Sequence, residues 1–280
     1  MTRHLALAVV LLAIGNAQAA EKALDKTFTV ASGGSLTVDA DGASVRISAG
    51  NTSQVVVHMS ARGSEDDIAD VKLEAVQNND GVAITMRRPD KRSWFRWGSW
   101  SSEEKIEVTV PRQYQVNVRT GGGNVELGGT TGTARLQTSG GDVSARNITG
   151  NIELRTSGGG IVADTIRGDV DANTSGGDVR LLKIDGKIRG NTSGGSVRCS
   201  LVGANRGISA TSSGGDIELT LPRATTGDVN ATTSGGGIDL DLPITTSEHK
   251  DGRVRGTLNG GGLPIEARTS GGNVSLRAAD

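Results

Sequence analysis

Apolar and polar residues alternate along most of this chain with a period of two, which is the pattern of β-strands that bury one face. From Thr120 to Thr192 the alternation itself repeats every 18 residues, in four successive steps. Aliphatic or small residues then form two columns, namely Val125, Val143, Ile161, Val179 and Val197 in one and Leu127, Ala145, Ala163, Leu181 and Cys199 in the other. A third column holds Ile148, Ile166, Ile184 and Val202.

A second strand follows in each repeat. Its inward columns are Ala134, Ile152, Val170 and Ile188, followed by Leu136, Leu154, Ala172 and Gly190. The residues between these columns are polar or charged, so they are expected to face water. Each repeat therefore predicts two short strands joined by two tight turns.

A Thr-Ser-Gly-Gly phrase precedes the first strand of each repeat. Copies begin at Thr138, Thr156, Thr174 and Thr192, after a Thr-Gly-Gly-Gly variant at Thr120, and later copies at Ser212, Thr233 and Thr269 depart from the 18-residue spacing. The threonine has the parity of the inward residues, so its hydroxyl is expected to bond to the glycine turn or to neighbouring threonines. Glycine adopts positive φ without strain, which predicts structural turns at Gly140, Gly141, Gly158, Gly159, Gly176, Gly177, Gly194 and Gly195.

A single repeat cannot bury its apolar face, whereas stacked repeats can. The sequence therefore predicts an all-β fold, a right-handed parallel β-solenoid with coils of about 18 residues and two short strands per coil. Two other repeat architectures do not fit the spacing of residues in this sequence. A hexapeptide helix needs an aliphatic residue every six positions, but Thr149 and Arg155 follow Val143. A calcium β-roll needs a third glycine beside Gly140 and Gly141. An antiparallel meander stays open, although it needs a covering layer.

The N-terminal segment 1–19 has the features of a secretory signal peptide. Arg3 and His4 precede an apolar run at 5–14, and Ala17-Gln18-Ala19 forms a small-residue cleavage site. The run is too short to span a bilayer, which leaves a non-cleaved anchor as the alternative. No cysteine lies near the cleavage site, which argues against a lipid anchor, and no second apolar segment follows. We therefore expect an exported protein of the periplasm, with the cell surface and the extracellular space as alternatives.

Residues 20–119 alternate less regularly. Predicted strands lie at 28–31, 35–39, 44–48, 54–60, 71–76, 82–86, 106–110 and 116–118, with an acidic connection at 64–70 that suits a helical turn. This region is expected to start the solenoid or cap it, because the terminal repeats of such arrays are atypical. The domain division is therefore a signal peptide at 1–19, an irregular β region at 20–119 and the regular array at 120–280.

Charge and cysteine content argue against nucleic-acid binding and against a reactive thiol. The formal charge of the chain is −1 and becomes −2 without Arg3, with both signs interspersed, which gives no electrostatic footprint for nucleic acid. Cys199 is the single cysteine and occupies an aliphatic column, so it is interpreted as a buried small hydrophobe. Stability must then come from coil stacking.

One segment departs from the pattern. Four of the six aromatic residues lie within 94–100, beside basic side chains. The candidate partner-binding residues are Trp94, Phe95, Arg96, Trp97 and Trp100. Such a loop suits binding to a partner, to sugar rings or to a membrane interface. The alternative is structural, with the rings folded over the β core.

The outward carboxylates are the other candidates. They are Asp142, Asp164, Asp169, Asp171, Asp178 and Asp216. Parallel β-helix enzymes that cleave polysaccharides use carboxylates on such a face as acid, base or metal ligand. Alternation with arginines favours cross-strand pairing instead. His58 and His249 are far apart and lack ligand spacing, so no metal, cofactor or catalytic residue is predicted.

Three features together carry a family resemblance: the signal sequence, the irregular strands that end at Val108-Thr109-Val110-Pro111, and the Thr-Ser-Gly-Gly copies followed by Asp, Gly or Asn and then Val or Ile. With them the chain resembles the DUF4097 family, described as "putative adhesins", and is similar to head-domain β-helix proteins of bacterial envelopes. The resemblance implies an exported bacterial β-solenoid without established catalytic residues.

The sequence is therefore interpreted as a non-enzymatic, adhesin-like structural or interaction protein of the cell envelope. Its partner would be an envelope protein or glycan, with self-association also open. The alternative is a carbohydrate-binding or polysaccharide-cleaving β-helix protein. A groove that brings together carboxylates with Arg or Lys would favour this alternative.

Overall fold

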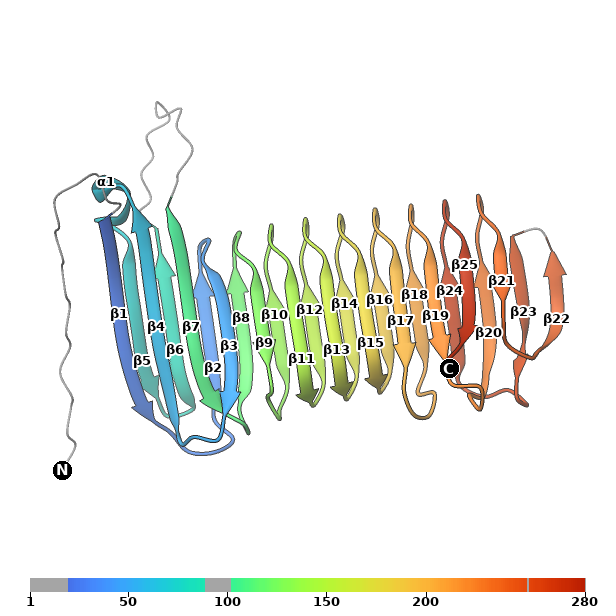
Figure 1. The fold of residues 1–280 in the computed structure, drawn as a ribbon, viewed down its shortest axis with the longest axis horizontal. Helices are drawn as coiled ribbons and strands as arrows, with labels where there is room; N and C mark the ends of the chain where they lie inside the picture. Colours follow the sequence, from blue (N-terminus) through green and yellow to red (C-terminus); the bar gives the residue numbers. More distant parts are fainter. Residues whose placement is uncertain (1–19, 89–101, 251, 280) are drawn as a thin grey trace.

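Two long β-sheets face each other along the whole length of the described chain, which comprises residues 20–88, 102–250 and 252–279 of this computed structural model (Figure 1). Sheet A has twelve described strands, in the order β1 (Ala20–Thr29), β4 (Gln54–Gly63), β7 (Glu103–Pro111), β3 (Ser44–Gly50), β9 (Val125–Gly128), β11 (Val143–Thr149), β13 (Ile161–Arg167), β15 (Val179–Asp185), β17 (Val197–Leu201), β19 (Ile217–Leu221), β25 (Val274–Ala278) and β21 (Ile238–Leu240).

Sheet B has thirteen described strands. Their order is β22 (Ile244–Lys250), β23 (Arg253–Leu258), β20 (Gly227–Thr232), β24 (Pro264–Arg268), β18 (Ile208–Thr211), β16 (Ile188–Asn191), β14 (Val170–Asn173), β12 (Ile152–Arg155), β10 (Ala134–Gln137), β8 (Gln115–Thr120), β2 (Ser35–Ala40), β6 (Gly81–Arg87) and β5 (Lys72–Asn78). The short helix α1 (Glu65–Ile68) occupies the predicted acidic connection, and Ser64 caps it by accepting from Asp67 N–H.

The regular part is a parallel stack in which successive coils pair in constant register, except for one shift between β15 and β17. Val143 lies opposite Ile161, and Ile152 lies opposite Val170, in each case one repeat further along the chain. This confirms the β-solenoid and excludes the antiparallel meander for the array. The chain alternates between the sheets because each coil contributes one strand to each, so both apolar faces point into the same interior.

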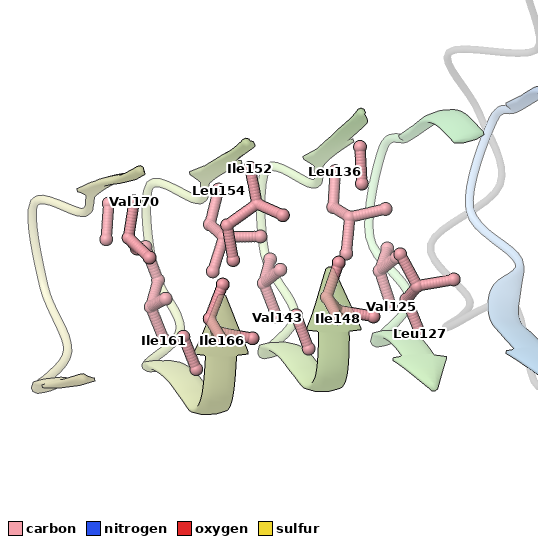
Figure 2. Packing of buried hydrophobic residues seen from close by; sticks show 14 of the residues in the cluster. Val125, Leu127, Leu136, Val143, Ile148, Ile152, Leu154, Ile161, Ile166 and Val170 are labelled. Carbon is pink, nitrogen blue, oxygen red and sulfur yellow. The ribbon is translucent and has the colours of Figure 1, made fainter. Parts of the chain in front are cut away.

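The predicted columns form the core between the sheets. Figure 2 shows residues from facing strands packed together, among them Val143, Ile148 and Leu154, each at most 1% exposed. Burying such columns supplies the main driving force, at about 25 cal/mol per Å² of apolar surface. Val202 departs from its predicted column. It is 41% exposed, because a register shift places Leu201 opposite Ile184 and starts a longer turn there.

Both ends of the stack depart from chain order. At one end, β2 lies between β6 and β8, and β3 lies between β7 and β9. At the other end, β24 lies between β18 and β20, and β25 lies between β19 and β21. Each terminal region therefore inserts one coil between two others, and antiparallel pairs such as β1 with β4 and β22 with β23 close the stack.

The gap between the edge strands β1 and β5 is bridged by polar side chains. Lys22 Nζ donates to the Ala69 carbonyl at 2.9 Å, and Lys26 Nζ donates to the Ala75 carbonyl at 2.7 Å. Lysines directed across an open end discourage pairing with another chain.

The predicted reason for the glycine pairs is wrong. None of the eight predicted turn glycines has a φ between +20° and +160°. A Cβ on Gly141 would instead lie 2.3 Å from the Gly123 carbonyl oxygen, and one on Gly159 would lie 2.1 Å from that of Gly141. The second glycine of each pair is therefore required by the close approach of successive coils. Left-handed residues lie at the opposite edge, at Asn147 (φ 55), Thr165 (φ 61), Lys183 (φ 54) and in glycines such as Gly150 (φ 139).

Candidate functional site

Each Thr-Ser-Gly-Gly turn is fastened to the preceding coil by its first side chain. The Thr156 hydroxyl donates to the Gly141 carbonyl at 2.8 Å and accepts from Gly159 N–H at 3.3 Å. Ser212 makes the equivalent pair of bonds. The predicted inward position is confirmed, and the glycine turn rather than a neighbouring threonine is the partner. The Thr120 hydroxyl donates to the Ala43 carbonyl instead, at 2.8 Å. The buried threonines at this position of the turn are Thr120, Thr138, Thr156, Thr174, Thr192, Thr233 and Thr269.

The outward aspartates beside these turns hold backbone of the adjacent coil. Asp142 Oδ1 accepts from Gly160 N–H at 2.7 Å, and Asp178 Oδ1 accepts from Ser196 N–H at 2.9 Å. Asp216 does the same for Asn273 N–H at 2.7 Å. These carboxylates act as structural hydrogen-bond acceptors between successive coils, a role that the sequence analysis did not anticipate.

The three remaining candidate carboxylates lie elsewhere. Asp169 Oδ1 accepts from Lys187 N–H at 2.9 Å on sheet B, and Asp171 accepts from the Asn173 amide. Asp164 accepts from the Thr165 hydroxyl at 2.9 Å on sheet A. The six predicted carboxylates are therefore divided between the two sheets. Two pairs line depressions, Asp169 with Asp171 on sheet B and Asp178 with Asp216 on sheet A.

That depression runs along the outer face of sheet B and has a volume of about 700 Å³. We call it the sheet B groove. It crosses β2, β8, β10, β12, β14 and β16, so it lies across the strands rather than along them. Its two banks are rows of side chains in register: Ser35, Gln115, Thr133, Asn151, Asp169 and Lys187 form the first, and Thr37, Asn117, Arg135, Glu153, Asp171 and Arg189 form the second.

Glu153 is the electrostatic centre of the groove. Arg135 Nη2 and Arg155 Nε each lie 2.5 Å from one of its carboxylate oxygens. Partial burial opposes the charge, but the hydrogen bonds from Arg155 and Arg135 outweigh it and lower the pKa of Glu153. The carboxylate is therefore ionised at neutral pH and holds both guanidinium groups in place. Asp171 and Arg189 form a looser pair at 3.8 Å.

The groove also offers polar groups that are not engaged by the described chain. Thr37, Asn117 and the Lys187 ammonium point outward and make no side-chain hydrogen bond with the described residues. Neighbouring groups of this kind stand one strand apart, about 4.8 Å. The arrangement can donate to and accept from a ligand that carries many hydroxyl or amide groups.

Two depressions of smaller volume lie on the described outer face of sheet A. One of about 320 Å³ lies around Arg180, Arg198 and Glu218, and another of about 250 Å³ lies around Arg46 and Glu126. Val162 stands between them in the same outward row. Both are smaller than the sheet B groove of about 700 Å³.

The predicted aromatic site is the other candidate from the sequence. Trp94, Phe95, Arg96, Trp97 and Trp100 lie outside the described residues, so their role stays a prediction.

Arg88 and Glu104 are described residues on either side of that segment. Arg88 Nε donates to Glu104 Oε1 at 2.7 Å, and the Glu104 side chain is 1% exposed. Arg88 N–H also donates to Asp41 Oδ2 at 2.8 Å. The ends of β6 and β7 that lead into the aromatic segment are thus joined by a largely buried ion pair.

The remaining chemically reactive residues are dispersed. His58 lies on β4, where its Nδ1 is 2.7 Å from Asp25 Oδ1, whereas His249 lies on β22 at the far end of the stack (Figure 1). Burial raises the pKa of the Cys199 thiol to about 12, as its column position predicts. Among the described residues, no cluster of His, Cys, Asp and Glu could hold a metal ion, and no helix has the length and hydropathy to cross a membrane.

The sequence analysis missed the sheet B groove. The available signal was the recurrence of Arg135, Glu153, Asp171 and Arg189 at intervals of one repeat. That interval places them in one row only if successive coils stay in register, which the structure establishes.

Distant structural likenesses extend over nearly the whole chain. A "putative lipid binding protein" from Parabacteroides distasonis is 13% identical with a TM-score of 0.42, over 92% of this chain and 97% of that one. A "putative adhesin" from Bacteroides fragilis is 10% identical with a TM-score of 0.40, over 92% and 97%. A "putative cell adhesion protein" from Clostridium sporogenes is 9% identical with a TM-score of 0.29, over 92% and 100%. No curated protein matches.

The family comparison is stronger and rests on sequence. Residues 34–277 match the family described as Toastrack DUF4097. This span contains nearly all of the regular array and of the inserted coils at both ends. The chain therefore belongs to the DUF4097 family.

Proposed function

We propose that this protein is a non-enzymatic, exported interaction protein of the bacterial cell envelope, adhesin-like in that it presents a rigid surface to an envelope partner. The supporting observation is the use of its outward carboxylates. Four of the six candidate aspartates accept backbone N–H groups of the adjacent coil, as Asp142 does from Gly160 at 2.7 Å. Their oxygens serve coil stacking, and this favours a scaffold over an acid and base pair.

Rigidity follows from the same contacts. Turn hydroxyls, outward aspartates and strand pairing all join neighbouring coils, so the outer side chains keep fixed spacings along the stack. A surface that is ordered before binding loses little conformational entropy when a partner docks. The signal sequence at 1–19 supports export, with the periplasm as the proposed location.

The aromatic segment is proposed as one partner-binding element. We would purify residues 20–280 and test their retention of partners from an envelope extract. The comparison is a variant with Ala at Trp94, Phe95, Trp97 and Trp100, whose fold is checked by circular dichroism and melting temperature. Loss of one specific partner by the folded variant assigns binding to this segment, and equal retention removes it from the proposal.

The carbohydrate-binding or polysaccharide-cleaving alternative is favoured by one observation, the sheet B groove with Asp169, Asp171 and Glu153 near basic side chains. Glu153 is held ionised between two arginines, which suits binding better than proton donation. Incubation with a panel of linear polysaccharides separates the two activities. New reducing ends or unsaturated products would overturn the non-enzymatic proposal.

A further inference from the structure

We infer that the sheet B groove is a binding site for a linear, uncharged polysaccharide chain that lies along the solenoid axis. The inference rests on the proposed function, since it names the ligand class that one surface of the interaction protein would take. It depends on the groove's direction, its available hydrogen-bonding groups and its charge balance.

The direction of the groove excludes an extended peptide that would bind by adding a strand to sheet B. Between β2 and β16 every strand of sheet B is hydrogen-bonded on both sides, so the groove floor has no free strand edge. Peptides bound by strand addition need such an edge. A ligand in this groove crosses the strands and contacts side chains alone.

The side chains suit a polyhydroxylated ligand. Thr37 and Asn117 lie side by side in the second bank, and both are exposed. Further along, Glu153 and Arg135 form a fixed acceptor and donor pair in the groove, and Arg155, which does not line it, holds Glu153 from the other side. Successive groups are about 4.8 Å apart, close to the length of one pyranose unit in an extended chain. Six strands cross the groove, so it spans about 24 Å, enough for several sugar rings.

The charge balance excludes a polyanion. The groove is lined by three basic residues, Arg135, Lys187 and Arg189, and by three acidic residues, Glu153, Asp169 and Asp171. A site for nucleic acid or an acidic polysaccharide would need a surplus of positive charge. The described lining has no aromatic side chain for stacking, so each sugar is held by hydrogen bonds and the affinity must grow with chain length.

The test is calorimetric titration of residues 20–280 with neutral β-1,4-linked oligomers of glucose and of N-acetylglucosamine, each as the dimer, tetramer and hexamer. We expect at least one hexamer to bind at least tenfold more tightly than its dimer. Oligogalacturonate hexamer is the anionic probe and should bind at least tenfold more weakly. Absence of binding by both neutral hexamers at millimolar concentration, equal affinity for dimer and hexamer, or preference for oligogalacturonate would overturn the inference.

Two variants and one matched control locate the site. Thr37→Ala with Asn117→Ala removes exposed groups and should weaken hexamer binding at least fivefold, while Asn117→Lys obstructs the groove and should abolish it. Ser144→Ala with Ser200→Ala makes equivalent changes on the outer face of sheet A and should leave binding unchanged. Equal loss in the control, or no loss in the groove variants, places the site elsewhere.

The results distinguish an error in the polysaccharide inference from an error in the proposed function. If the oligomers do not bind but the protein still retains a partner from the envelope extract, the glycan inference is wrong and the interaction proposal stands. If the hexamer binds and is cleaved, the groove is a glycan site and the non-enzymatic proposal is wrong.

Discussion

The Thr156 hydroxyl lies 2.8 Å from the carbonyl oxygen of Gly141, fifteen residues earlier in the chain, and so joins two successive coils at their turn. The same hydroxyl oxygen accepts from Gly159 N–H at 3.3 Å within its own turn. One side chain therefore bonds to two backbone groups of the turns, the Gly141 carbonyl and the Gly159 N–H. Because the arrangement recurs from coil to coil, the turn edge is a continuous hydrogen-bonded column.

Replacing Thr156 by Val keeps the shape of the side chain and removes its hydroxyl. Two buried backbone groups then lose their partner, which should lower the free energy of unfolding by about 1–3 kcal/mol. Urea denaturation followed by circular dichroism measures the change. Thr133→Val on the exposed face of sheet B is the control and should stay within about 0.5 kcal/mol of the wild type. A Thr156→Val variant as stable as this control would show that the column contributes nothing.

Gly159→Ala tests whether crowding rather than φ requires the glycine. The new Cβ would lie 2.1 Å from the Gly141 carbonyl oxygen, so the coils must separate locally. We expect a loss of at least about 1–3 kcal/mol, as for other overpacked sites. Gly128→Ala is the matched control, because its Cβ would meet nothing within 4 Å. Similar melting temperatures for the two variants would contradict the crowding argument.

The inserted position of β25 can be tested with two leucines that lie opposite each other. Leu276 on β25 is fully buried between β19 and β21, whereas its partner Leu240 on the edge strand β21 is only half-buried. Leu276→Ala should cost about 2–5 kcal/mol, and Leu240→Ala clearly less. If the coils stacked in chain order, β25 would be terminal and the ranking would reverse in equilibrium unfolding.

Cys199 should be inert in the folded protein. Its pKa of about 12 exceeds the unfolded value, so the folded state keeps its proton as the pH rises. Its contribution to stability is therefore complete below about pH 8.5 and is lost progressively between there and pH 12. Relative to Cys199→Ala, the wild type should lose stability over that range. Rapid reaction of the native thiol with an aromatic disulfide reagent at pH 8 would show that the side chain is accessible.

Local pattern was sufficient for much of the fold. The strand positions, the inward columns through Val143 and Ile152 and the buried thiol of Cys199 all follow from residue parity, because burial of one strand face is encoded in a period of two. The inward threonines followed in the same way. The exposed Val202 did not, although the sequence carries a sign of the change: Ser212 follows Thr192 by 20 residues instead of 18, which lengthens the turn of this coil.

By itself, the sequence determined that this chain stacks apolar β-coils and turns at glycines, since strand period and repeat length are properties of neighbouring residues. Only the tertiary structure decided which coil lies beside which. Ile208 can accept either Val229 or Ile265 as its neighbour on chemical grounds, and the fold places Ile265 there. The sheet B groove depends on the same decision, because side chains one repeat apart, such as Arg135 and Glu153, form one row only when every coil keeps its register.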